Sequence, residues 1–214
     1  MKTLLTFLRL LRTAFVLARH AALVPREYAK NVPWFVRLAG WFSRIFAVRD
    51  RAKNPGERFA HALEKLGPAY IKVGQILATR SDMLDPDFSR GLARLKDQVP
   101  PFPKQDAIAC IEKELGKQWQ DVFTSLSEPK AAASVAQVHK AELKDGSIVA
   151  VKVLRPNIHK NMEKDMDVLR MVAWFAETFI PVSRRMGPKL FVKTASRAVM
   201  LELDLRLEAA AASE

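Results

Sequence analysis

The sequence predicts an α+β fold, in which helices precede a small antiparallel sheet and further long helices follow it. Three observations support this class. Glycine and proline divide the first half into segments of helical length, two strand-like runs near the middle are joined by Asp145-Gly146, and two long helical patterns fill most of the last quarter. Strands and helices come in separate runs and do not alternate, which disfavours a parallel α/β sheet.

Length and composition are those of a globular chain. The 214 residues suffice for one large domain or two small ones, and 49% of them are apolar, which allows a sizeable core. Glycine and proline together account for 20 residues, too few for a fibrous or disordered chain. The single cysteine, Cys110, excludes a disulfide framework. We interpret it as a small buried hydrophobe in a reducing, cytoplasm-facing compartment.

Positive charge is concentrated near the N-terminus. The chain carries a net charge of +12, of which residues 1–55 contribute +9 from 11 basic and two acidic side chains. Within this part, residues 3–24 hold three arginines inside a leucine-rich run, which makes them a poor membrane span and a poor signal peptide. Residues 32–46 set five aromatic side chains beside two arginines. Helices of this composition lie among lipid headgroups.

Three interpretations of this basic front end stay open. We favour contact with an anionic membrane surface, to which Arg9, Arg12 and Arg19 would contribute. The second interpretation is an ordinary amphipathic helix packed on its own domain. Nucleic-acid binding is the third and is disfavoured, because a dense aliphatic face accompanies the aromatic residues and no nucleic-acid-binding motif is present.

Helical segments follow a polar linker at residues 47–56. Gly67-Pro68 separates the first two helices, since glycine ends a helix and proline opens the next. Asp87 is the expected cap of the third helix, after a turn at Asp85-Pro86. A proline-rich connector at 100–103 precedes the fourth, which ends at Gly116. The four helices are expected at about 57–66, 69–80, 88–97 and 104–115.

The pattern changes after Trp119. Residues 134–143 and 147–154 read as two strands joined by a tight turn at Lys144-Asp145-Gly146. Two long helices are then expected, at about 158–180 and 188–212. The chain therefore divides into three predicted parts: a basic membrane-associating segment at 1–55, a helical extension at 56–118, and a part that contains the sheet at 119–214.

A lone lysine in an apolar strand is the first candidate for chemistry. Lys152 must find an anionic partner or lie beside a ligand. Upstream of it, a loop of small residues allows backbone N–H groups to approach a phosphate chain. A small-residue loop, a hairpin and Val-Ala-Val-Lys follow one another in this order in a protein-kinase N-lobe. The candidate nucleotide-binding residues are Lys130, Ala131, Ala132, Ala133, Ser134, Val135, Ala136, Gln137, Val138, Ala150 and Lys152.

Two further groups of polar residues are weaker candidates. Lys72 and Gln75 share one helical stripe, and the nearby Gly74 costs about 1 kcal/mol relative to alanine in a helix, which indicates close packing. Taken alone, the stripe favours a solvated face. Three carboxylates are expected on the last helix, and such spacing is also typical of solvated residues. They are Glu202, Asp204 and Glu208.

Together these motifs resemble the UbiB family of atypical kinases. The resemblance covers about residues 57–210, in order and at plausible spacings. It includes Lys72-Val73-Gly74-Gln75 within residues 66–84, Val99-Pro100-Pro101, the run from Ala131 to His139, Asp145-Gly146, the run from Val149 to Pro156, Glu202-Leu203-Asp204 and Glu208-Ala209. The combination is highly specific, although each motif alone is not.

The resemblance implies a partial protein-kinase-like N-lobe preceded by a helical extension. It implies ATP or ADP as the bound nucleotide, with magnesium. Lys152 would contact the α- and β-phosphates and pair with Glu208, and the small-residue loop would cover the phosphates. Lys72 and Gln75 would reach into the site, with Lys72 opposite Glu202. Such charges suit phosphoryl chemistry. An inserted lysine would obstruct a protein substrate, so a small-molecule or lipid-linked ATPase is favoured over a protein kinase.

The family also implies a role in ubiquinone biosynthesis. We expect a peripheral protein on the cytoplasmic face of the inner membrane, with other ubiquinone-biosynthesis proteins as partners and no nucleic acid. The catalytic loop and magnesium ligands are expected in a C-lobe beyond residue 214, so turnover by these residues alone is not expected. Ala211 stands where the family usually has asparagine. The alternative to an ATP-binding role is a non-enzymatic, membrane-bound adaptor.

Overall fold

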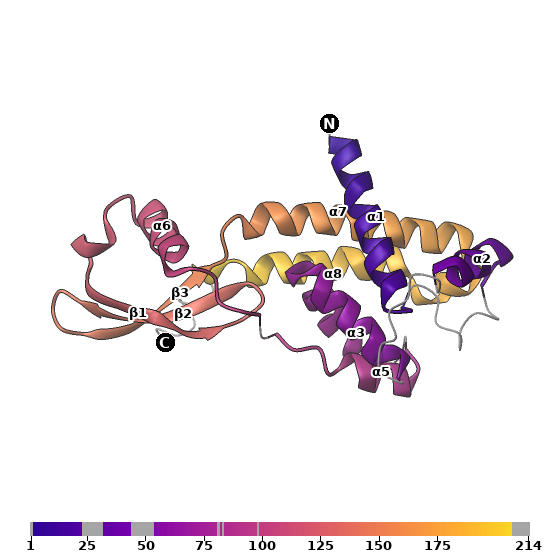
Figure 1. Ribbon diagram of the computed structural model, residues 1–214, viewed down its shortest axis with the longest axis horizontal. Coiled ribbons are helices and arrows are strands. Elements are labelled where there is room, and N and C mark those ends of the chain that lie inside the picture. Colours follow the sequence, from indigo (N-terminus) through magenta and orange to yellow (C-terminus); the bar gives the residue numbers. More distant parts are fainter. Residues whose placement is uncertain are drawn as a thin grey trace. The chain divides into compact units, whose positions relative to one another are not determined.

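The computed structural model divides into two compact units, each described here for the residues whose placement it defines (Figure 1). The first unit comprises residues 1–96 and 162–214 and is discontinuous in sequence, whereas the second comprises residues 97–161. The predicted division into three parts along the chain stays a prediction. The structure describes residues 2–22, 32–43, 54–80, 82, 84–97 and 99–206.

Helices make up the described part of the first unit. Packing connects α3 with both α4 and α5, α1 with α3, and α4 with α8. Helix α7 begins in the second unit and continues into the first. The bounds are α1 Lys2–Arg19, α2 Trp34–Ser43, α3 Pro55–Leu66, α4 Pro68–Ala78, α5 Pro86–Leu92, α7 Ile158–Phe179, η4 Pro181–Met186 and α8 Pro188–Glu202.

The boundary between α3 and α4 confirms the prediction from Gly67-Pro68. Asn54 caps the start of α3, where its side chain accepts a hydrogen bond of 2.7 Å from the N–H of Gly56. Gly67 has a φ of 115°, and its N–H closes α3 by donating to Leu63 O at 3.1 Å. Pro68 then opens α4, because the first helical position needs no N–H.

The third helix, α5, differs from its predicted bounds of 88–97. It begins two residues earlier because the side chain of Asp85, and not that of Asp87, accepts from the helix N-terminus. It ends at Leu92, after which the chain turns so that both Leu92 and Leu95 reach the core. Both leucines pack near Gly74. An added Cβ at Gly74 would lie 2.6 Å from Leu95 Cδ1, which confirms the close packing predicted for this glycine.

The last helix also differs from the prediction. Helix α8 ends at Glu202, ten residues before the expected end, and Leu203 turns inward to become buried. Asp204 lies beyond the helix, where its carboxylate accepts a hydrogen bond of 3.1 Å from the N–H of Arg206. The prediction that Glu202 and Asp204 share one helix is therefore wrong. Glu208 lies outside the described residues.

The second unit contains a three-stranded antiparallel sheet in the order β1-β2-β3. The strands are β1 Phe123–Ala132, β2 Ala136–Leu143 and β3 Ile148–Leu154. The hairpin of β2 and β3 confirms the two predicted strands, and Gly146 in their turn has a φ of 84°. The sequence did not predict β1, because Pro129 and irregular pairing with β2 interrupt its alternation.

Helix α6, Lys104–Leu115, packs beside the sheet, and a three-ten turn, η3 Trp119–Asp121, connects it to β1. Gly116 ends α6 in the left-handed region with a φ of 65°, as predicted. Cys110 is only partly buried at the edge of this core, and that burial raises the pKa of its thiol. The buried core residues are Ala107, Ile111, Phe123, Leu126, Ala141 and Val153.

Candidate functional site

The two faces of the sheet in the second unit differ in burial. On β3, Val149, Val151 and Val153 belong to the apolar core, whereas Ala150 and Lys152 are exposed on the other side. This alternation is the period of two that a half-buried strand requires. We call the second side the open face. It consists of Val138, Lys140 and Glu142 from β2 with Ile148, Ala150 and Lys152 from β3.

Three of the predicted nucleotide-binding residues lie in one row across the sheet. Ala131 of β1 pairs with Val138 of β2, and Val138 pairs with Lys152 of β3. Directly paired residues project to the same side of an antiparallel sheet. The row therefore places a lysine next to two small or medium apolar side chains, a surface on which a flat base or a phosphate chain can lie. Ala150 lies one alternate position before Lys152 on the same face.

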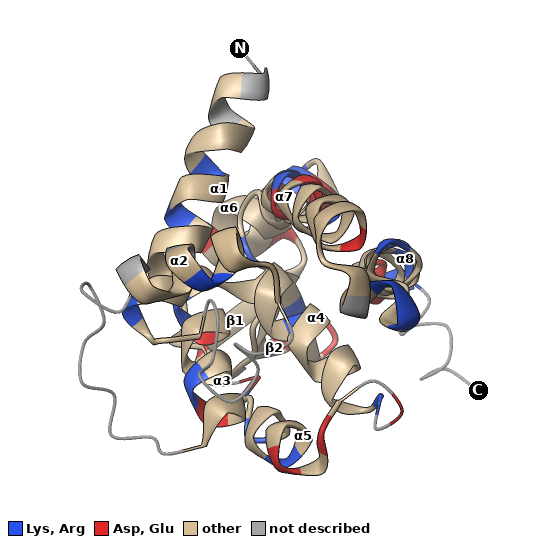
Figure 2. Ribbon diagram, turned by 90° about the vertical axis from the view of Figure 1, so that its right-hand side faces the viewer, with Lys and Arg blue, Asp and Glu red and all other residues tan. Residues whose placement is uncertain are grey.

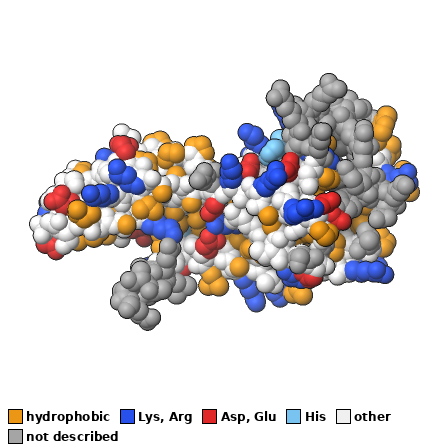
Figure 3. All heavy atoms as spheres, turned by 90° about the horizontal axis from the view of Figure 1, so that it is seen from below, with side chains coloured by type: hydrophobic (Ala, Val, Ile, Leu, Met, Phe, Trp, Pro, Cys, Tyr) orange, Lys and Arg blue, Asp and Glu red, His pale blue; other side chains and the backbone are white. Residues whose placement is uncertain are grey.

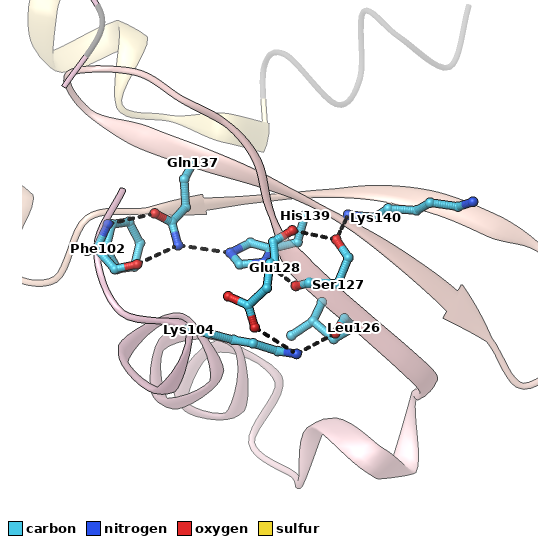
Figure 4. Close-up of polar contacts among 8 residues, drawn as sticks. All are labelled: Phe102, Lys104, Leu126, Ser127, Glu128, Gln137, His139 and Lys140. Carbon is cyan, nitrogen blue, oxygen red and sulfur yellow. Dashed lines mark hydrogen bonds and ion pairs between the residues drawn. The ribbon is translucent and has the colours of Figure 1, made fainter. Parts of the chain in front are cut away.

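Gln137 projects to the opposite side. Its side chain is buried, and its Oε1 accepts a hydrogen bond of 2.9 Å from the N–H of Phe102 while its Nε2 donates to Phe102 O at 3.2 Å (Figure 4). The side chain of Gln137 therefore lies on the core face of the sheet. A contact between Gln137 and a phosphate would have to come from its backbone.

The loop between β1 and β2 carries the small residues. The N–H of Ala133 donates to Ala136 O at 2.8 Å, which closes the loop tightly. Ser134 is fully buried, and its Oγ has no hydrogen-bond partner within the described part of the chain. Buried hydroxyl groups are normally paired. An orphaned donor at this position is the observation that fits a bound anion.

In the first unit, Lys72 of α4 forms an ion pair with Glu202 of α8. The Lys72 side chain is 10% exposed and that of Glu202 is 48% exposed. The interpretation of the Lys72 stripe as a solvated face is therefore wrong. Gln75 is half-buried one turn further along, and Thr79 turns its hydroxyl back to Ile76 O at 2.8 Å. Figure 2 shows α4 and α8 side by side in this unit.

The structure thus brings the predicted residues together in two groups. One is the Lys72–Glu202 pair of the first unit, and the other is the row Ala131–Val138–Lys152 of the second. The expected contact of Lys152 with Glu208 involves a residue outside the described part. Lys130 is exposed at the end of β1. Within the described residues, no group of three or more His, Cys, Asp or Glu side chains is arranged to hold a metal ion.

Helix α1 packs on the first unit by its polar side. Arg9 forms an ion pair with Asp165 of α7, and Thr13 Oγ1 lies 2.8 Å from the Tyr70 hydroxyl. Burial raises the pKa of Asp165, and Arg9 acts against that shift. Burial also raises the pKa of Tyr70, although the hydrogen bond with Thr13 lowers it. Internal packing is thus confirmed for this side, and Arg9 faces a carboxylate of its own chain.

The opposite side of α1 exposes a row of apolar residues at helical spacing: Leu4, Leu8, Leu11 and Phe15. On α2, Trp34 and Trp41 are exposed as well. None of the helices in the described ranges combines the length and the apolar character needed to cross a membrane. On the face that Figure 3 presents, lysine and arginine side chains are interspersed with carboxylates and do not form one continuous basic stripe.

Arg155 and His139 stand in the motifs that carry the family resemblance, but sequence reasoning assigned neither of them a role in fixing the loop between β1 and β2. Arg155 donates hydrogen bonds to three backbone carbonyls of the second unit, and Phe102 lies beneath its guanidinium. Apart from that motif, the signal for Arg155 in the sequence is a basic residue directly after an apolar strand. His139, which is fully buried beside Gln137, belongs to the same surroundings.

Comparison with known proteins identifies a protein family that matches this chain. A model of the ABC1 atypical kinase-like domain matches residues 94–214. The "Probable protein kinase UbiB" of Pseudomonas paraeruginosa is 41% identical over 218 aligned positions, which cover 99% of this chain and 40% of that protein. The protein of the same name from Marinobacter nauticus is 40% identical over 210 positions, with 96% and 38% covered. The chain spans about two fifths of the length of these curated relatives.

Proposed function

The chain belongs to the ABC1 atypical kinase-like family, and we propose that it holds the phosphates of ATP or ADP in a UbiB-type protein that supports ubiquinone biosynthesis at a membrane. The family match confirms the resemblance inferred from the motifs. The activity, substrate and partners of the whole protein are part of this proposal, since the chain spans about two fifths of its relatives.

The row of Ala131, Val138 and Lys152 carries the proposal. Transfer of a phosphoryl group depends on positive charge held at fixed positions around the phosphates, and little covalent chemistry is asked of the protein. Lys152 would supply that charge from a strand, which is a rigid support. The loop from Ala131 to Val138 would cover the phosphates. The Ser134 hydroxyl has no hydrogen-bond partner among the described residues, which supports a phosphate oxygen as its acceptor.

The nucleotide would supply the phosphoryl group, and magnesium would neutralise its charge. We propose that the magnesium ligands lie in the part of the relatives that this chain does not span. Roles at the site for Lys72, Gln75, Glu202, Asp204 and Glu208 are also proposals. We still favour a small-molecule or lipid-linked ATPase over a protein kinase.

Peripheral membrane attachment is the second element of the proposal. The exposed apolar row of α1 and the exposed tryptophans of α2 support it, because such residues insert into the boundary between headgroups and acyl chains. Because Arg9 pairs with Asp165, we propose that insertion of apolar side chains contributes more to membrane attachment than the charge of this arginine does. The cytoplasmic face of the inner membrane and contacts with other ubiquinone-biosynthesis proteins follow from the family role and stay proposals.

The test compares nucleotide stabilisation of matched variants. The C-terminal part of the Pseudomonas paraeruginosa relative is joined after residue 214, and thermal unfolding is followed with and without Mg-ATP. A ligand at 100 times its Kd stabilises a protein by about 2.7 kcal/mol, and we expect Lys152→Ala to abolish that gain. Lys140→Ala is the control, because Lys140 lies on the same open face beside Ala150.

An ATP shift that survives in Lys152→Ala refutes the assignment of the lysine. If the unaltered fusion binds vesicles and shows no shift with ATP, ADP or either nucleotide with magnesium, the membrane-bound adaptor becomes the better description.

A further inference from the structure

Arg155 lies directly after β3 and ties two separate segments together. Its Nη2 donates to Pro100 O at 2.8 Å and to Val99 O at 3.3 Å, both in the proline-rich connector before α6. The same guanidinium donates to Ala133 O in the loop between β1 and β2, from Nη2 at 3.0 Å and from Nε at 3.3 Å. The backbone N–H of Arg155 donates to Val135 O at 2.9 Å.

The connector is itself held at a second point. The ring of Phe102 lies under the Arg155 guanidinium, with 5.5 Å between the ring centroid and Cζ. Gln137 binds both backbone groups of Phe102, and its Nε2 lies 2.9 Å from His139 Nε2 (Figure 4). His139 Nδ1 in turn lies 2.9 Å from Ser127 O. The connector therefore serves as a fixed base against which Arg155 holds the loop.

This arrangement determines which way one peptide of the loop points. The peptide bonds of the described chain are trans, and in a trans peptide the C=O and the following N–H point in opposite directions. Because Arg155 binds the C=O of Ala133, the N–H of Ser134 is directed away from Arg155. The orphaned hydroxyl belongs to the same residue, Ser134. A donor-rich loop binds phosphate only if its carbonyl oxygens are turned aside.

We propose that Arg155 is a positioning residue of the phosphate-binding loop: its guanidinium holds the carbonyl of Ala133 against the connector so that the N–H of Ser134 faces a nucleotide phosphate. The inference rests on the proposed function. Arg155 itself does not touch the nucleotide in this role. It acts through the backbone of the loop.

The chemistry of arginine explains why this residue type is needed. The guanidinium presents several N–H donors in a planar fork, and it reaches carbonyls on two segments at once. A lysine carries the same charge as one compact ammonium group and cannot reproduce the fork. A methionine fills similar space but leaves the carbonyls without their charged donor. Substitution by lysine therefore tests the geometry of the donors at constant charge, and substitution by methionine tests the charged donor at similar packing.

The first measurement needs no nucleotide. Hydrogen exchange of residues 131–137 is followed in the unaltered chain, in Arg155→Lys and in Arg155→Met. We expect exchange in the loop to accelerate about tenfold or more in both variants, because hydrogen bonds with a charged donor are lost. Exchange in α6 and in the turn at Gly146 should stay unchanged, which shows that the unit remains folded. Lys144→Met, at an exposed position in that turn, is the matched control.

The second measurement uses the fusion with the C-terminal part of the Pseudomonas paraeruginosa relative. We expect Arg155→Lys to raise the Kd for Mg-ATP about tenfold with little change in Tm, since the loop is mispositioned while the core is intact. Unchanged loop exchange, or an unchanged Kd in a protein that binds ATP, overturns the inference alone. If the unaltered fusion binds no nucleotide, the proposed function fails and this inference fails with it.

Discussion

The ammonium group of Lys72 pairs with the carboxylate of Glu202 across the contact between α4 and α8. The lysine is nearly buried and the glutamate is half exposed, so the two partners differ in how much solvent compensates for a lost contact. Removing the exposed partner takes an opposite charge away from a nearly buried ammonium group, whereas removing the buried partner leaves a carboxylate that water can solvate.

We expect Glu202→Gln to lower the free energy of unfolding by about 1 to 2 kcal/mol, which is less than for a fully buried pair because Glu202 is half exposed. Lys72→Met should cost less, since a methionine of similar length suits the buried site. Urea denaturation measures both. Asp167→Asn is the control, because its pair with Arg170 on α7 is exposed. An unchanged stability of Glu202→Gln would remove any structural role for the pair.

Gly74 offers a test of packing against helix propensity. Alanine is the better helix former by about 1 kcal/mol, yet its Cβ would lie 2.5 Å from Leu63 Cδ1 and 2.6 Å from Leu95 Cδ1. Both leucines are buried and have little room to move. We therefore expect Gly74→Ala to destabilise the protein by about 1 to 2 kcal/mol in spite of its propensity.

The double variant Gly74→Ala with Leu95→Ala checks the cause of that loss. Because the shorter side chain makes room for the new Cβ, the combined loss should be smaller than the sum of the two single losses. Additive losses in urea denaturation would show that the crowding at Leu95 is not responsible.

The contact of Tyr70 with Thr13 predicts a pH dependence at the alkaline end. Burial raises the pKa of Tyr70, so the folded protein keeps this proton to higher pH than the unfolded chain. Its contribution is complete below about pH 10, the ordinary value for tyrosine, and is lost as the pH rises through the folded pKa. Tyr70→Phe should flatten the fall in stability above pH 10.

At neutral pH the same change should cost about 1 kcal/mol, because Thr13 loses its partner in a buried position. Thr13→Ala should cost a similar amount, and the double variant should cost little more than either single change. Denaturation series at pH 7 and above pH 10 measure these quantities. A fall above pH 10 that is equally steep in Tyr70→Phe would assign the alkaline loss to other groups.

Local signals in the sequence were sufficient for elements whose ends are set by one or two residues. Gly67-Pro68 separated α3 from α4, and Asp145-Gly146 joined β2 to β3, since backbone conformation at glycine and proline is a property of the residue itself. The edge strand β1 was not predicted from the sequence. Its pairing with β2 is irregular, and its residues therefore do not follow a regular alternation of apolar and polar side chains.

The candidate site was predictable only where one strand contains it. Lys152 stood out as the single charge in an apolar run, and the structure places it on the exposed face of β3. Arg155 did not stand out, because its acceptors are contributed by residues 22 to 56 positions earlier in the chain. Likewise Gln137 has its partner 35 positions away, so its direction depended on the tertiary fold.

The apolar row of α1 predicts how the protein meets a membrane. Leu8 and Leu11 are exposed on the side of the helix opposite Thr13. We expect Leu8→Ser with Leu11→Ser to weaken binding to anionic vesicles at least about tenfold, because two large side chains no longer enter the lipid boundary. Co-sedimentation measures the bound fraction, and circular dichroism confirms that the helical content is retained.

Leu190→Ser is the matched control, since Leu190 is an exposed leucine on α8 in the same unit. Arg9 is left unchanged in this series, because reversing its charge would place two acidic groups together at Asp165 and disturb the packing of α1. If the double variant of α1 still binds vesicles as the unaltered protein does, the row is not a membrane-contacting surface, and the aromatic residues of α2 become the next to test.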